Sequence, residues 1–191
     1  GVQPSNLKPR YPVFHGPGAP VKTFLDRFDP QQDPFEARSV KVLETYPSLV
    51  LIGLGWIRPH VSRPEGRLPK YNPERSTFSW EDWRYVCGQL AKEATKMGVE
   101  ALAVWAKGKQ RVNAEGRRDL KAFQDQVDAC ICLVAGLHLA ERKPSLVVGN
   151  PEEGYMVTPS AATLVQELRR RCDDVSCSRD DWVRAYELPA H

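Results

Sequence analysis

The chain has 191 residues, 41% of them hydrophobic, which is enough for one domain with a buried core. Its net charge of +3 is too small to demand a polyanionic partner, and no stretch approaches the roughly 20 apolar residues that span a bilayer. The first residues lack the apolar core of a secretion signal, and five cysteines, an odd number, indicate reduced thiols. We therefore expect a cytoplasmic protein.

The first 38 residues are rich in proline and glycine and predict an N-terminal arm with one short helix, in APVKTFLDRF. The next stretch, SVKVLETYP, predicts a strand because valine alternates with lysine before the run stops at Pro47. SLVLIGLGW follows as a buried strand or a short helix, which periodicity does not separate. Its glycines do not form a dinucleotide fingerprint, because Arg58 occupies the position of the third glycine.

The middle of the chain alternates between a charged loop and helical patterns. Four prolines and many charges predict a surface loop from Ile57 to Phe78. Ser79 stands three residues before Asp82, close to a capping box, and predicts the start of a helix that ends at Gly98. VEALAVWAKG then fits either a strand or a second helix.

The stretch FQDQVDACICLVAG carries two carboxylates in an otherwise apolar run. We expect a helix from about Arg117 to near Ala140, on which Asp125 and Asp128 are neighbours at i and i+3. The residues that follow leave no clear polar side, which is typical of an internal helix. Since both acids lie past the first turn, the helix dipole does not fully explain them. Ordinary electrostatics and a metal-binding acid cluster both remain open.

Toward the C-terminus, SLVVGNPEEGYMVTP predicts a hairpin whose loop ends in glycine. A helix is expected from about Ser160 to Arg171. Residues 176–191 are interpreted as a tail with at most one further helical turn.

Basic residues concentrate in two segments. Residues Arg58–Arg75 hold five basic residues against two acids, and Lys107–Lys121 hold six against two, so together they carry +7 and the rest of the chain −4. A fold that joins the segments would create one basic face suited to nucleic acid, whereas separate segments would be solvated loops. The candidate nucleic-acid-binding residues are Arg58, Arg63, Arg67, Lys70, Lys107, Lys109 and Arg111.

Other site chemistries fit the sequence poorly. The cysteine spacing does not match a zinc site, and Cys130 and Cys132 are better explained as small core residues. The tryptophans are expected in the core, except that Trp56, beside the basic loop, stays open as a base-stacking residue. Glu44 lies near the end of the predicted strand, where a charge is costly unless it is paired or bound to a cation.

Four motifs in this order resemble domain of unknown function family 429, described as predicted RNase H-like nucleases. They are VLETYP at Val42–Pro47, RLPKYNP at Arg67–Pro73, DQVDACICLVAGLHLA from Asp125, and VVGNPEEGYMVTP ending at Pro159. The resemblance covers roughly Ser39 to Pro159.

The resemblance implies an α/β fold, with an RNase H-like mixed sheet and helices on both faces over residues 39–175. The first antiparallel strands of that fold, one of which carries a catalytic aspartate, are missing or rebuilt here. It further implies that Glu44, Asp125 and Asp128 are catalytic residues that bind Mg²⁺ or Mn²⁺, with Lys70 as a phosphate contact.

On this resemblance we expect a metal-dependent nuclease that hydrolyses phosphodiester bonds of a nucleic acid. The alternative is an inactive module of the same fold that binds nucleic acid or a protein partner, which includes a second copy of the chain.

Overall fold

The computed structural model describes residues 27, 34–35, 42–112, 119–150, 154–174, 176 and 178–188. Within these residues the helices are α3 (Pro47–Gly53), α4 (Trp80–Lys96), α5 (Glu100–Gln110), α6 (Leu120–Ala140), α7 (Ala162–Asp174) and α8 (Arg179–Trp182). The strands are β1 (Arg58–His60), β2 (Arg63–Arg67), β3 (Ser145–Asn150), β4 (Gly154–Pro159) and β5 (Val183–Tyr186). The predicted α/β class is confirmed.

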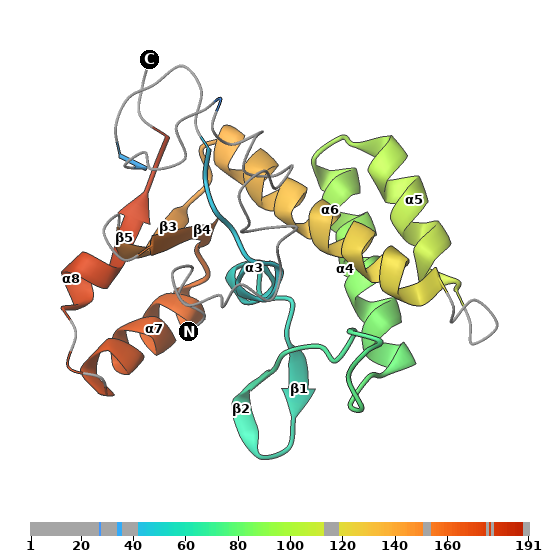
Figure 1. Cartoon of the computed structure of the whole chain (residues 1–191), viewed down its shortest axis with the longest axis horizontal. Helices are drawn as coiled ribbons and strands as arrows, with labels where there is room; N and C mark the ends of the chain where they lie inside the picture. The colour runs from blue at the N-terminus through green and yellow to red at the C-terminus, as the bar shows by residue number, and fades with distance from the viewer. Residues whose placement is uncertain are drawn as a thin grey trace.

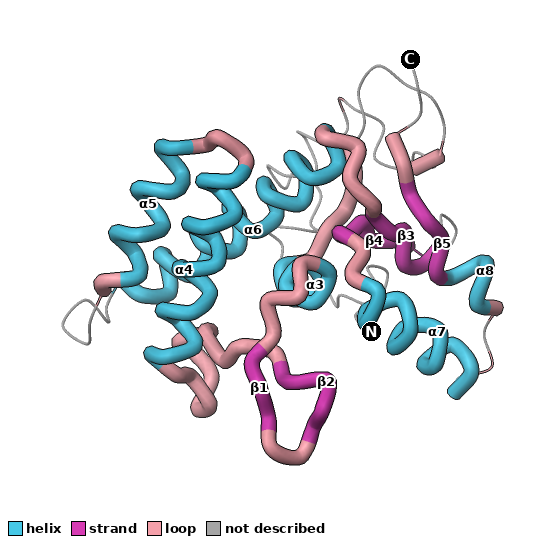
Figure 2. The backbone as a smooth tube through the Cα atoms, turned by 180° about the vertical axis from the view of Figure 1, so that it is seen from behind, coloured by secondary structure: helices cyan, strands magenta, loops and turns pink. Residues whose placement is uncertain are grey.

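The elements form two groups with α3 between them. Helices α4, α5 and α6 pack together on one side, and the sheet of β3, β4 and β5 lies on the other side with α7 and α8 (Figures 1 and 2). In the described residues both sheets are antiparallel: β1 pairs with β2, and the second sheet has the order β4-β3-β5. The RNase H-like mixed sheet stays a prediction.

Helix α4 begins and ends where its local signals predict. The Ser79 hydroxyl accepts a hydrogen bond from the Asp82 backbone N–H at 3.3 Å, which satisfies one of the free donors of the first turn. At the other end Gly98 adopts φ +70°, the left-handed conformation that commonly follows a helix. VEALAVWAKG forms helix α5 rather than a strand.

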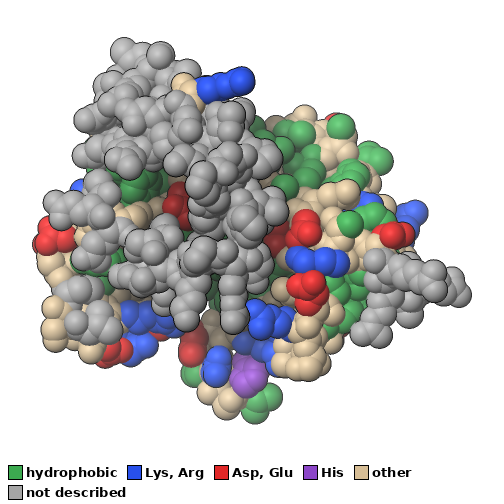
Figure 3. All heavy atoms as spheres, viewed as in Figure 1, with side chains coloured by type: hydrophobic (Ala, Val, Ile, Leu, Met, Phe, Trp, Pro, Cys, Tyr) green, Lys and Arg blue, Asp and Glu red, His purple; other side chains and the backbone are tan. Residues whose placement is uncertain are grey.

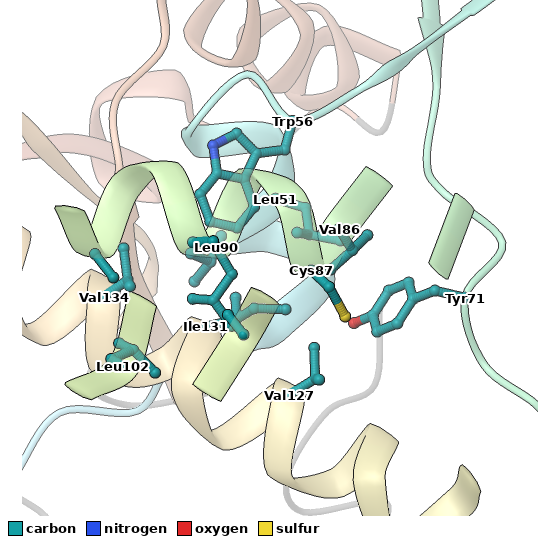
Figure 4. Packing of buried hydrophobic residues seen from close by; sticks show 14 of the residues in the cluster. Leu51, Trp56, Tyr71, Val86, Cys87, Leu90, Leu102, Val127, Ile131 and Val134 are labelled. Carbon is teal, nitrogen blue, oxygen red and sulfur yellow. The ribbon is translucent and has the colours of Figure 1, made fainter. Parts of the chain in front are cut away.

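The main core lies between α3, α4, α5 and α6. Leu51 of α3 and Leu90 of α4 meet Ile131 and Val134 of α6, all fully buried (Figure 4). Helix α6 ends at Ala140 as predicted but begins at Leu120, later than expected. Its apolar run is not internal on all sides, because Leu133 remains 51% exposed. Only one side of α6 is therefore buried in the core.

The predicted strand over residues 39–47 is wrong where the structure describes it. Residues 42–46 form no strand, although the Val157 N–H donates to the Glu44 carbonyl at 2.7 Å beside β4. Pro47 has no N–H for a further pairing and instead starts α3, whose first carbonyl, that of Tyr46, accepts from Leu49 and Val50. The chain therefore passes beside β4 with this backbone contact and then enters α3 at Pro47.

The predicted surface loop Ile57–Phe78 contains an antiparallel hairpin, β1–β2, which projects from the molecule (Figure 1). Pro59 and Pro64 did not favour strands, but proline is acceptable in edge strands. Gly66, with φ +85°, approaches β1 so closely that an added Cβ would lie 2.7 Å from the Arg58 carbonyl oxygen.

The C-terminal sheet begins with the predicted hairpin, because β3 and β4 pair in regular register from Ser145↔Pro159 to Asn150↔Gly154. Strand β5 adds to the other edge of β3, so the predicted tail 176–191 contributes a strand and the sheet extends beyond residue 175. The short VRAY segment gave too little alternation to reveal this pairing.

The predicted N-terminal arm and its short helix lie outside the described residues except at Arg27, Pro34 and Phe35. The Tyr186 hydroxyl donates to the Pro34 carbonyl at 2.8 Å. No helix in the described part of the chain is long and apolar enough to cross a membrane.

Candidate functional site

A cleft of about 530 Å³ opens between the start of α3, the β1–β2 hairpin, the loop after the hairpin and α6. We call it the basic cleft. Its lining residues are Tyr46, Pro47, Ser48, Leu51, His60, Arg63, Arg67, Leu68, Pro69, Lys70, Tyr71, Asn72, Arg75, Thr77, Gln124 and Asp128.

Positive charge dominates this lining. Arg63, Lys70 and Arg75 have exposed side chains, and within the described residues none of the three forms an ion pair. Asp128 is the one acidic residue among the described residues that line the cleft. Lys and Arg side chains gather with a histidine around the hairpin at the lower edge of the molecule (Figure 3). The cleft therefore offers cations to a ligand.

Two further arginines of the hairpin have a structural task. Arg67 donates to both carboxylate oxygens of Asp82 at 2.5 and 3.2 Å, and the Arg58 Nε lies 3.2 Å from the same group. The Lys70 backbone N–H adds a bond of 2.7 Å. These contacts fasten both strands of the hairpin to the first turn of α4, so Arg58 and Arg67 are anchors of the hairpin.

The electrostatics of Asp82 match this task. Its side chain is fully buried, and burial alone would raise its pKa. The hydrogen bonds from Arg67 and from the Lys70 N–H, together with the charge of Arg58, outweigh burial and hold the pKa of Asp82 below its ordinary value. The carboxylate therefore stays ionised at neutral pH.

Asp128 sits at the inner end of the cleft between two donors. The Tyr71 hydroxyl donates to Oδ1 at 2.6 Å, and the Gln124 amide donates to Oδ2. Burial is the main cause that raises the pKa of Asp128, and it exceeds the opposing effects of the Tyr71 hydrogen bond and of Lys121. The pKa of Tyr71 is also raised, first by burial and then by the Asp128 charge.

The structure brings only one of the three predicted metal ligands into the cleft. Asp125 is exposed and pairs with Lys121 on α6, because positions i and i+3 differ by about 60° around a helix and only Asp128 faces inward. Glu44 is exposed in the segment before α3 and does not line the cleft. In the part of the chain that is described, no group of three or more His, Cys, Asp and Glu could hold a metal ion.

The second basic segment serves other surfaces. Lys109 places its ammonium 3.4 Å from the Phe123 ring centre, a cation–π contact, and Lys107 borders a separate groove between α4 and α5. Arg111 is exposed just beyond α5. None of these three residues lines the basic cleft, and Arg117 and Arg118 lie outside the described residues. Within the described residues, the cations of this cleft therefore come from the first basic segment.

The candidates chosen from the sequence do not include Arg75, Tyr46 or Tyr71, which line the cleft. Arg75 was counted in its basic segment but not chosen, and Tyr46 and Tyr71 were only letters of motifs. Aromatic residues next to cations were the available signal. Trp56, the candidate for base stacking, is 5% exposed and belongs to the core, so that interpretation is wrong.

Comparison of the chain with family models, curated proteins and solved structures finds no match. The resemblance to the RNase H-like nuclease family therefore stays a prediction.

Proposed function

We propose that the chain binds nucleic acid by its phosphates in the basic cleft. The observation that carries the proposal is that Arg63, Lys70 and Arg75 line one cleft without an ion pair in the described residues. Guanidinium and ammonium groups are the side chains that bind phosphate oxygens, arginine as a two-pronged donor and lysine as a point charge.

The rest of the cleft supports an anionic ligand. Asp128 is half-buried in the lining, and its carboxyl accepts from Tyr71 and Gln124, whose donor dipoles offset part of its repulsion of a phosphate. Arg67 and Asp82 anchor the base of the hairpin that carries Arg63, so the strand that presents this cation to the cleft is held in place. An anchored backbone loses less entropy on binding than a free loop does.

The test is a fluorescence anisotropy titration of labelled single-stranded and duplex oligonucleotides at increasing salt. Three phosphate contacts predict a slope of log K against log salt of about −2 for single strands and about −2.7 for duplex, or about 20- to 40-fold weaker binding between about 50 and 200 mM. Lys70→Gln and Arg75→Gln should each reduce the slope by about 0.7 to 0.9.

Arg169→Gln on α7 is the matched control, because Arg169 is an exposed arginine outside the cleft, and it should change neither affinity nor slope. Unchanged slopes in both cleft variants would place the binding elsewhere. Failure to bind any of the nucleic acids at about 50 mM salt would refute the proposal and favour a protein partner.

A metal-dependent nuclease of RNase H-like fold is the second candidate, favoured by one observation. Asp128 lines the same cleft as the cations and has a raised pKa, which is typical of carboxylates at functional sites. Binding of Mg²⁺ or Mn²⁺ as first expected would require Glu44 and Asp125 to approach Asp128. Incubating the bound oligonucleotides with either metal tests it: cleavage lost in Asp128→Asn supports this candidate, and uncut strands remove it while leaving binding intact.

A further inference from the structure

The basic cleft contains two tyrosines with opposite surroundings. Tyr71 is 7% exposed and belongs to the core cluster (Figure 4). Its hydroxyl donates to Asp128. Tyr46 lines the same cleft but is 53% exposed. Tyr46 therefore presents about half of its surface, in a lining that also carries cations, where a ligand can contact it.

The backbone on both sides of Tyr46 is fixed. Its carbonyl accepts from the Leu49 and Val50 N–H groups at 2.9 and 3.0 Å, and Pro47 directly after it starts α3. Two residues earlier, the Glu44 carbonyl is bound by Val157 of β4. Since Tyr has few rotatable bonds, a ring on such a backbone can contact a ligand at low entropic cost.

The cations and the ring share one cleft of a size that suits one or two nucleotides. In a duplex the bases are stacked and paired, so a ring at the rim would meet only the backbone. In a single strand a base can leave the stack and lie on an aromatic face, next to the phosphates that flank it.

We propose that the basic cleft binds single-stranded nucleic acid, with one base stacked on Tyr46 and the adjoining phosphates on Arg63, Lys70 and Arg75. This inference rests on the proposed function and adds the strand state of the ligand and the residue that selects it. Stacking is tolerant of sequence because every base presents a π-face. The cleft therefore discriminates strand state more than sequence.

The experiment measures the affinity of the full chain for three probes. They are a single strand short enough to bind in one register, the same strand lacking the base expected to stack (the abasic strand), and the duplex. Single-stranded DNA and RNA of the same sequence are both included. Tyr46→Leu should weaken single-strand binding by about 5- to 150-fold, and Tyr46→Phe, which keeps the ring, should stay within about threefold of the parent. Duplex binding should be the same in all three proteins.

The abasic strand provides the same test on the unaltered protein. It should bind the parent about as weakly as the intact strand binds Tyr46→Leu, and the two losses should not add, because both remove one stacking pair. If Tyr46→Leu binds the single strand as well as the parent does, or Tyr46→Phe loses as much as Tyr46→Leu, the stacking inference is overturned. In that case salt-dependent binding that still responds to Arg75→Gln would leave the proposed function standing, whereas no binding of any strand would remove both.

Discussion

Replacing Asp82 by asparagine should destabilise the protein by detaching the β1–β2 hairpin from α4. The substitution keeps the shape of the side chain but removes the charge that meets Arg67 at 2.5 and 3.2 Å and Arg58 at 3.2 Å. Breaking a buried ion pair costs about 3 to 5 kcal/mol. Because the two arginine side chains are 22% and 23% exposed and keep some hydration, we expect about 2 to 3 kcal/mol.

The loss should appear in urea unfolding followed by the fluorescence of the tryptophans, among which Trp83 is fully buried next to Asp82. For a chain of this size it corresponds to a fall in Tm of about 5 to 10 °C. The folded pKa of Asp82 lies below its unfolded value of about 3.9, so the carboxylate stabilises the protein above that pH and the stabilisation is lost as the pH falls through the folded pKa. The difference between parent and variant should thus be full at pH 7 and shrink below about pH 4.

Glu81→Gln is the matched control. Glu81 also pairs with Arg58, but its side chain is 76% exposed, so its loss should cost less than about 1 kcal/mol. If Asp82→Asn unfolds within about 0.5 kcal/mol of the parent at pH 7, or if its deficit is the same at pH 3 as at pH 7, the anchoring role of the Asp82 charge is refuted.

Two further predictions concern α3 and the inner end of the basic cleft. Gly53→Ala should destabilise the protein by about 1 to 3 kcal/mol, because the new Cβ would lie 2.3 Å from the Pro159 carbonyl oxygen. Gly108→Ala on α5, whose Cβ would have no atom within 4 Å, should stabilise the protein by about 0.4 to 1 kcal/mol. Equal effects of the two variants in urea unfolding would contradict the close packing of α3 on β4. Tyr71→Phe should cost about 0.5 to 3 kcal/mol at neutral pH, because it removes the hydroxyl that donates to the Asp128 carboxyl at 2.6 Å. Because the folded pKa of Asp128 is raised, ionising this carboxyl costs stability as the pH rises through that pKa. A hydrogen bond to the ionised carboxylate should matter less when Asp128 is protonated, so the stability deficit of Tyr71→Phe should be smaller at about pH 4 in the same assay. An equal deficit at both pH values would exclude a bond to the ionised carboxylate.

Local chemistry was enough for several elements because all of their determinants are close in sequence. The Ser79 cap marks the start of α4 and Gly98 marks its end. The hairpin β3–β4 follows from two apolar runs on either side of a turn. The same local logic failed for residues 39–47, where an alternating pattern predicted a strand and Pro47 started α3. It also failed for β5, whose four residues become a strand only because β3 offers them an edge.

For the candidate site, the sequence by itself determined that Asp125 and Asp128 share a helix and that cations concentrate at residues 58–75. Only the tertiary structure decided that Asp128 meets Tyr71 while Asp125 meets Lys121. The reason is that helical spacing fixes the relative directions of two side chains but not which of them faces the rest of the protein.

The same division applies to charges and rings that look alike in sequence. Arg67 and Arg75 belong to one basic segment, yet Arg67 pairs with buried Asp82, 15 positions away, whereas Arg75 is exposed in the cleft. Tyr46 and Tyr71 both occur in short sequence motifs, but packing buries Tyr71 and leaves Tyr46 exposed. Composition and local pattern therefore determined which groups this chain has, whereas burial and long-range pairing, which depend on the whole packed core, decided which of them are available to a ligand.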